Sequence, residues 1–144
     1  MAGIAPLPTH LTLEVVTPDR SVVTERVDEV EIPGADGYFG VLPGHTPLLA
    51  MLQVGELWYR KGTEKVYLSI AFGFAEVLPN RVTILAQLAE RSDEIDIARA
   101  EAAKRRAEER IAKAVPDMDY ERARVALLKS LVRLQVSARA RTRA

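Results

Sequence analysis

The sequence lacks the residues and runs on which several classes of protein depend. None of its 144 residues is cysteine, which excludes disulfides and thiolate chemistry and suits a reducing compartment. No run approaches the about 18 apolar residues of a membrane-spanning helix, and the opening MAGIAPLPTH has no basic segment before an apolar core. We therefore expect a soluble chain that is not secreted.

Glycine is missing from the later part of the chain, and proline nearly so. All 8 glycines and 7 of the 8 prolines precede residue 80, whereas the sequence from Ala89 onward is rich in alanine, arginine and glutamate. This change in composition predicts two parts, residues 1–88 and residues 89–144.

The two parts also differ in charge, although the whole chain has a formal net charge of zero. Residues 1–88 carry 6 lysines or arginines against 10 acids, and residues 89–144 carry 14 against 10. After Glu121 every charged residue is basic: Arg122, Arg124, Lys129, Arg133, Arg139, Arg141 and Arg143. A basic surface without acids predicts an acidic partner for this end of the chain.

The first part reads as a series of strands. Short runs rich in Val, Ile, Thr and Tyr are interrupted by Gly, Pro and Asp: LTLEVVTP, SVVTERVDEVEIP, GELWYRK, EKVYLSI and FAEVLPNRVTILAQ. Apolar residues are interspersed with acids over residues 27–32, a pattern close to the alternation of a half-buried strand. Because no helical pattern lies between these runs, we expect a small antiparallel β-sandwich.

The second part has helical spacing over residues 93–114 and 118–138, with Pro116 as a stop signal between them. So short a linker predicts an antiparallel two-helix hairpin, and the fold class is therefore α+β. The first segment has a stripe of small residues, formed by Ala100, Ala103, Ala107, Ile111 and Ala114. The second has a broader apolar face than one such helix covers, so we expect the hairpin to dock on the sandwich or on another chain, and to have two alternative packings.

The stretch GYFGVLPGHTPLLAML, residues 37–52, contains one of the two histidines of the chain. Catalysis at His45 would need a partner base or nucleophile, and a metal site would need more donors than two distant histidines offer. Pro43, Gly44 and Pro47 restrict the backbone around it, which favours a rigid loop that contacts a partner. The chain has no phosphate-binding glycine loop and no Ser, His and acid constellation, so we expect a protein that is not an enzyme.

The two helical segments open alike, with IDIARA at residues 95–100 and MDYERA at residues 118–123. An aspartate in the first turn suits the helix dipole, and this explains the pattern without any ligand. The alternative is that a helix start beside Arg99, with Arg106 and Arg133 from the hairpin, binds the phosphates of a nucleotide.

Together these segments resemble the epsilon subunit of the bacterial F-type rotary ATP synthase. The resemblance covers nearly the whole chain from Leu13 and is carried by VVTPDR, GVLPGHTPLLA, FAEV, NRVTILAQLAER, IDIARA and the arginine-rich hairpin. It implies a ten-stranded N-terminal β-sandwich and a two-helix hairpin on the central rotor stalk. It also implies a peripheral place at the cytoplasmic face of the bacterial inner membrane, reached only through the complex.

The resemblance further implies partners for each part of the chain. The sandwich would bind the gamma subunit and the c-ring of the membrane sector. The docking residues implied are Tyr38, Val41, Pro43, Gly44, His45 and Pro47. The hairpin would move between a compact and an extended state, the latter blocking ATP hydrolysis at the catalytic alpha and beta subunits, with Arg122, Arg124, Lys129 and Arg133 facing an acidic segment.

In some members of this family the IDxxRA motif forms part of a regulatory ATP site. The positions implied here are Ile95, Asp96, Arg99 and Ala100, with Glu90, Arg106 and Arg133 as companions. No cofactor is otherwise expected. Three residues depart from the family pattern: Lys129 in place of an arginine, Tyr38 in place of an acid, and Phe72 in place of the first of two glycines.

A free nucleic-acid-binding module is the rival interpretation, because the basic end of the chain would suit phosphates. The acidic first part and the scarcity of aromatic residues near the basic helix stand against it. We therefore expect no nucleic acid among the partners.

Overall fold

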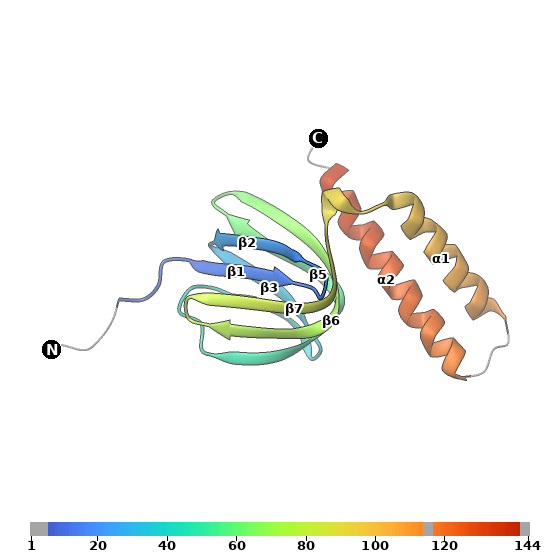
Figure 1. Ribbon diagram of the computed structural model, residues 1–144, viewed down its shortest axis with the longest axis horizontal. Helices are drawn as coiled ribbons and strands as arrows, with labels where there is room; N and C mark the ends of the chain where they lie inside the picture. The colour runs from blue at the N-terminus through green and yellow to red at the C-terminus, as the bar shows by residue number, and fades with distance from the viewer. Residues whose placement is uncertain (1–5, 114–116, 142–144) are drawn as a thin grey trace.

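The computed structural model describes residues 6–113 and 117–141. Figure 1 shows a sheet that curls over itself, with two helices beside one of its faces. The sheet has seven strands: β1 (Leu11–Val16), β2 (Ser21–Val27), β3 (Glu29–Gly34), β4 (Gly37–Val41), β5 (Leu48–Lys61), β6 (Glu64–Leu78) and β7 (Arg81–Arg91). A short 3₁₀ turn, η1 (Ser92–Glu94), leads to the helices α1 (Ile97–Ala112) and α2 (Asp117–Arg141).

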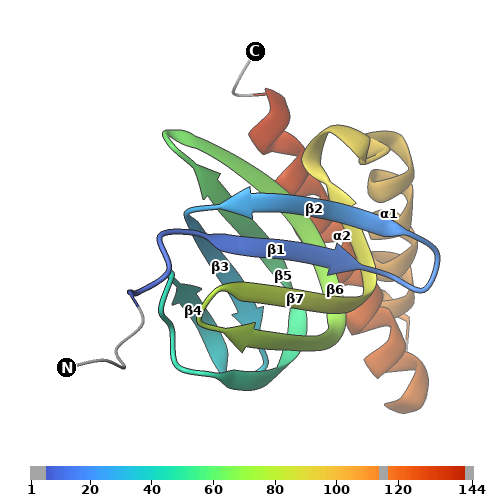
Figure 2. The same ribbon diagram turned by 60° about the vertical axis from the view of Figure 1, so that its left-hand side comes forward.

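The strand order is β2-β1-β7-β6-β5-β3-β4, and every pairing is antiparallel except that of β1 with β7. Figure 2 shows β1 and β2 lying in front of β3 and β5, which closes the two layers of the sandwich. The predicted β-sandwich is thus confirmed, with one parallel pair. Seven strands are present instead of the implied ten, because β5 and β6 span 14 and 15 residues, each about twice an ordinary strand.

Residues 37–52 were expected to form one loop, but the structure divides them among two strands and a shorter loop. Gly37–Val41 form β4, and β5 begins at Leu48, so only residues 42–47 are irregular. The density of glycine and proline suggested a loop, but backbone pairing with β3 and β6 outweighs that local preference.

The long strands reverse their inward face partway along. In β6, Ile70 and Ala75 are both fully buried in the core although they are five residues apart, an odd spacing that strict alternation forbids. Gly73 lies between them with φ +128°, and a Cβ there would lie 2.0 Å from the carbonyl oxygen of Leu85. Glycine is therefore required where β6 bends against β7.

The core of the sandwich is formed by apolar residues from all seven strands. On β1 these are Leu11, Leu13 and Val15, all completely buried, and the opposite layer contributes Leu57 and Leu68. This core contains no residue of the helices, so the sandwich has a core of its own.

The helices form the predicted antiparallel hairpin, but α1 begins at Ile97 and not at residue 93. Residues 92–94 form the 3₁₀ turn, Ile95 is extended, and the Asp96 side chain accepts a hydrogen bond from the Arg99 N–H at 3.1 Å. An N-cap with extended φ and ψ starts the helix one residue later. Ala114 and Pro116, expected at the end of the first helix and in the linker, lie outside the described residues.

Small residues bring the helices together, as the stripe on the first segment predicted. Ala100 and Ala107 of α1 are buried, and so are Ala123, Ser130 and Ser137 of α2. The two serines satisfy their hydroxyls within α2, where they donate to the carbonyl oxygens of Ala126 and Leu134. Among the described residues, no helix is long and apolar enough to cross a membrane.

The hairpin docks on the sandwich through α2, which covers part of the outer face of β5 and β6, while α1 lies on the far side of α2 (Figure 1). A second apolar cluster fills this contact; we call it the docking cluster. It consists of Val54, Ala71, Ile95, Val132 and Val136. The expectation that the hairpin docks on the sandwich is thereby confirmed, and its second packing stays a prediction.

Candidate functional site

The loop of residues 42–47 is held by backbone hydrogen bonds, one within the loop and one to the turn between β6 and β7. The N–H of Gly44, a residue with φ +86°, donates to the carbonyl oxygen of Pro79 at 2.7 Å, and the N–H of His45 donates to that of Leu42 at 3.2 Å. His45 Nδ1 lies 2.7 Å from the carbonyl oxygen of Thr46, so its ring is engaged within the loop. No group of three or more metal-ligating side chains occurs in the part of the chain that the structure describes.

Two of the expected docking residues differ in what they present to a partner. Tyr38 is half exposed, and its hydroxyl accepts a hydrogen bond from the Glu56 N–H at 3.1 Å. Val41 is completely buried in the core of the sandwich, so its side chain cannot contact a partner. The expectation for Val41 was wrong because the strand that contains it points this residue inward.

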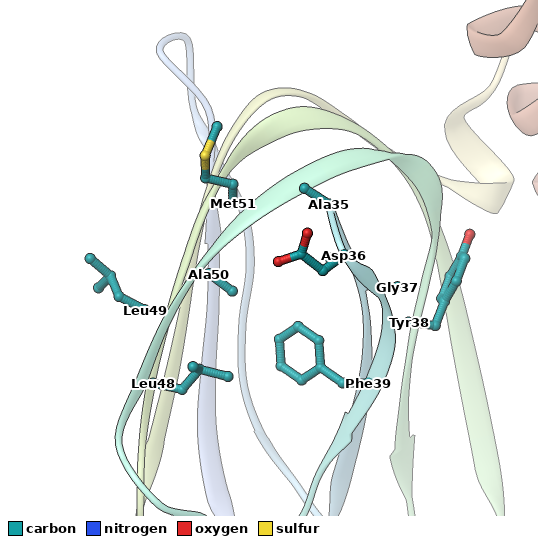
Figure 3. Close-up of a pocket in the computed structure, with 10 residues that line it drawn as sticks. Ala35, Asp36, Gly37, Tyr38, Phe39, Leu48, Leu49, Ala50 and Met51 are labelled. Carbon is teal, nitrogen blue, oxygen red and sulfur yellow. The ribbon is translucent and has the colours of Figure 1, made fainter.

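A pocket of about 580 Å³ opens between the β3–β4 turn and the start of β5. Figure 3 shows Asp36 and Phe39 between the two segments, with Leu48 and Ala50 on the strand that faces them. The lining is mostly apolar, with a single carboxylate. Such a pocket, next to the loop of residues 42–47, has the size and lining to bind an apolar side chain of a partner.

A row of exposed apolar residues crosses the same outer face that α2 covers farther along the strands. Met51 on β5 pairs with Phe74 on β6, which pairs with Leu85 on β7, and these three side chains are 62%, 51% and 54% exposed. We call these three residues the apolar row. Leu49 and Leu88 extend it, and so contiguous an exposed apolar surface is typical of an interaction site.

The apolar row was not predicted, because these segments were identified only as strands and their apolar positions were not divided between two faces. The available signal was the spacing of Leu85 and Leu88. On one regular strand, successive side chains point to opposite faces. Leu85 lies between Ile84 and Ala86, and Leu88 precedes Ala89, so neither leucine can point to the same buried face as these neighbours.

Two ion pairs join α2 to the sheet. Arg139 donates to both carboxylate oxygens of Glu56 at 3.1 Å, and the Glu56 side chain is only 10% exposed. This hydrogen-bonded partner raises the pKa of Arg139 above its ordinary value, and its guanidinium also lies 4.8 Å from the centre of the Tyr67 ring. Arg133 donates to both oxygens of Glu90, at 2.7 and 3.3 Å.

The basic end of α2 is therefore less free than its sequence suggests. Arg124 pairs with Glu121 within the helix, in addition to the pairs of Arg133 and Arg139 with the sheet. Lys129 lies 5.5 Å from the centre of the Phe72 ring, and Arg122 is exposed. The expectation of a basic surface without acids was therefore wrong for Arg124, Arg133 and Arg139, because their carboxylate partners are Glu121 and residues from earlier in the chain.

The residues implied for a nucleotide site are only partly brought together. Ile95 and Ala100 are buried, Asp96 caps α1, and Arg99 and Arg106 are exposed. Between the described residues, no hydrogen bond or ion pair joins Arg99 or Arg106 to the Glu90–Arg133 pair. In this conformation, a phosphate would have to replace the Asp96 carboxylate at the Arg99 N–H and the Glu90 carboxylate at Arg133.

Comparison with known proteins accounts for both parts of the chain. Residues 10–92 match the family model for the β-sandwich domain of the ATP synthase delta/epsilon chain, and residues 93–138 match that for its long α-helix domain. An ATP synthase epsilon chain of Syntrophotalea carbinolica is 51% identical over 130 residues, which cover 90% of this chain and 94% of the relative.

Two solved structures share the fold. A chain in a Euglena gracilis mitochondrial ATP synthase structure, described as OSCP/F1/c-ring, has a TM-score of 0.79 and 23% identity, covering 99% of this chain and 87% of that one. A chain in the central stalk/c-ring structure of the Tetrahymena thermophila mitochondrial ATP synthase has a TM-score of 0.59 and 11% identity, covering 92% and 99%. The family models and the identity to named epsilon chains show that this chain belongs to the ATP synthase delta/epsilon chain family.

Proposed function

We propose that the chain is a non-catalytic central-stalk subunit of an F-type ATP synthase, which couples gamma to the c-ring and restrains ATP hydrolysis through its helical hairpin. The observation that carries the regulatory part is the separation of two clusters. The sandwich has a complete core, and α2 docks outside it on the five-residue docking cluster. The hairpin can therefore leave without opening the core of the sandwich.

The exposed surfaces of the sandwich support its role as the docking module. We assign the apolar row to gamma, because a continuous apolar face buries well against another protein. We assign the loop of residues 42–47 and the adjacent pocket to the c-ring. Tyr38, Pro43, Gly44, His45 and Pro47 remain the residues proposed for that contact.

Release of the hairpin would free basic side chains for the catalytic subunits. Arg133 and Arg139 lose their partners on the sheet when α2 leaves, and Arg122 and Lys129 already lie at its surface. These cations would then meet acidic residues of the alpha and beta subunits. To change such an equilibrium from 1:99 to 99:1 requires about 5.5 kcal/mol of differential binding, which a large catalytic assembly can provide.

Truncation after Glu94 tests the proposed inhibition. This cut keeps all of β7 and the ion pair between Glu94 and Arg20, and it removes both helices. In the assembled enzyme we expect faster ATP hydrolysis with unchanged subunit composition. An unchanged rate would exclude the inhibitory role, and loss of the subunit from the complex would show that the hairpin is needed for assembly instead.

ATP is a second proposed ligand, at the start of α1. Arg99 is exposed in the first turn of a helix whose N-terminus favours anions, and ATP would compete there with the Asp96 carboxylate that caps the helix. Titration of ATP against the isolated chain should give a saturable signal that Arg99→Ala abolishes and Arg110→Ala, on the last turn of α1, preserves. No saturable, Arg99-dependent signal at millimolar ATP would refute this site.

The nucleic-acid interpretation has little support in the structure. Three of the cations on α2 are paired with carboxylates, so their charge is already neutralised locally. We propose instead that the chain reaches the membrane only through the complex, at the cytoplasmic face of a bacterial inner membrane. Affinity capture should recover gamma and the catalytic subunits, and salt-sensitive recovery of nucleic acid would contradict this proposal.

A further inference from the structure

Phe72 has an unusual backbone for its residue type. It is the only residue other than glycine in the described part of the chain with a positive φ, +60°. A side chain in this left-handed region crowds the backbone, and glycine does not have this cost. Ala71 and Gly73 pair with both neighbouring strands, whereas Phe72 is paired with neither in the described ladders.

The bend in β6 does not itself need a phenylalanine. Gly73 is dictated by the close approach of Leu85, as described above, but glycine at position 72 would adopt φ +60° without strain. The sandwich therefore gains no backbone stability from the side chain of Phe72. The free-energy cost of the left-handed backbone at Phe72 must therefore be offset by the contacts of its ring.

The ring of Phe72 contacts the docked helix. It packs against the docking cluster, to which α2 contributes Val132 and Val136, and the Lys129 ammonium lies 5.5 Å from its centre. It also lines a groove of about 430 Å³ under the preceding turns of α2, together with Val125 and Ala126. The ring thus faces α2 over more than one helical turn.

We propose that Phe72 is a positioning residue that holds α2 in the docked state at the expense of sandwich stability. The contacts of its ring with α2 exist only while that helix is docked, whereas the backbone strain belongs to the sandwich in both states. Glycine at this position should therefore have opposite effects on the two parts: a more stable sandwich and a looser hairpin. This inference rests on the proposed docking and release of the hairpin.

The test compares Phe72→Gly and Phe72→Ala in the otherwise full-length chain. Docking is read as the distance between nitroxide labels at Gln87→Cys and Glu108→Cys, two exposed positions in a chain without native cysteine. Sandwich stability is read from thermal unfolding followed by the fluorescence of Trp58, the single tryptophan, which lies on β5.

We expect both variants to show a several-fold larger undocked fraction, because both remove the ring. Phe72→Gly should raise the unfolding temperature of the sandwich, whereas Phe72→Ala keeps the strain and should not raise it. Phe74→Ala is the matched control, since Phe74 lies two residues away on the same strand in the exposed apolar row. Its docked fraction should equal that of the parent chain.

Unchanged docking in both Phe72 variants would overturn the proposal. So would a lower unfolding temperature in Phe72→Gly, because it would show that the side chain stabilises the sandwich itself. Both measurements use the isolated chain, so either failure would leave the inhibitory role untouched. The truncation after Glu94 tests that role separately in the assembled enzyme.

Discussion

Tyr59 shows how one buried hydroxyl can set the pH dependence of the sandwich. Its side chain is completely buried, and its hydroxyl has no hydrogen-bond partner among the described residues. Burial raises the pKa of Tyr59 above its ordinary value, and the nearby charge of Glu25 adds to this. The folded chain therefore holds this proton more tightly than the unfolded chain, so its contribution to stability is complete below about pH 10 and declines above it.

Replacement of Tyr59 with phenylalanine removes both the titration and the unpaired hydroxyl. We expect Tyr59→Phe to be as stable as the parent at neutral pH, or up to about 1 kcal/mol more stable. Above about pH 10, its free energy of unfolding should fall less steeply than that of the parent. Urea unfolding at several pH values measures both effects, and a clear loss of stability at neutral pH would mean that the hydroxyl does have a partner.

At the same scale, Arg139 should decide how firmly α2 docks. Arg139→Gln leaves the Glu56 carboxylate nearly buried without its charged partner, which should weaken docking by about 1–3 kcal/mol. We expect a larger undocked fraction by label distance and, in the assembled enzyme, slower ATP hydrolysis. Arg124→Gln removes an exposed pair within α2 and should leave the docked fraction close to that of the parent chain. Equal effects of the two variants would contradict this assignment.

At the scale of elements, the sequence predicted the strands and helices that depend on neighbouring residues. It did not predict features that depend on pairing with residues distant in the sequence. The strand over Leu11–Val16, the two helices and the small residues between them follow from neighbouring residues. The start of β5 at Leu48 does not, because its pairing partners near Val77 lie almost thirty residues away. The charge partners of Arg133 and Arg139 were missed for the same reason, since Glu90 and Glu56 are distant in sequence.

The hairpin and the sandwich should unfold as separable elements, because their apolar clusters are distinct. The chain truncated after Glu94 should remain folded, with a cooperative thermal transition and a tryptophan spectrum like that of the full chain. It should also bind a hydrophobic dye, since Val54 and Ala71 lose their cover. A truncated chain without a cooperative transition would show that the sandwich depends on the hairpin.

At the scale of the whole molecule, one outer face serves two contacts. The same three strands, β5, β6 and β7, contribute both the surface near α2 and the exposed apolar row. No sequence pattern distinguishes these uses, because both place apolar residues on the same face. The position of α2 divides this outer face into two parts. The part around Val54 and Ala71 is covered by the helix, and the apolar row remains exposed.

A charge in the apolar row should therefore prevent assembly without unfolding the chain. We expect Leu85→Glu to reduce binding to gamma by at least about tenfold, because a carboxylate would have to be buried in an apolar interface. Its unfolding temperature should remain close to that of the parent, since Leu85 is already half exposed. Thr63→Glu, in the exposed turn at the other end of β5 and β6, is the control. Full binding by Leu85→Glu would show that gamma uses another face.

The parallel pairing of β1 with β7 has a consequence for how the chain is made. The first strand needs the last one, since Leu13 pairs with Val82 and β7 lies between β1 and β6 in the sheet. During synthesis the sandwich therefore cannot close until β7, which ends at Arg91, has left the ribosome, and β6 has an open edge until then. The helices emerge afterwards and meet a sandwich that is already complete.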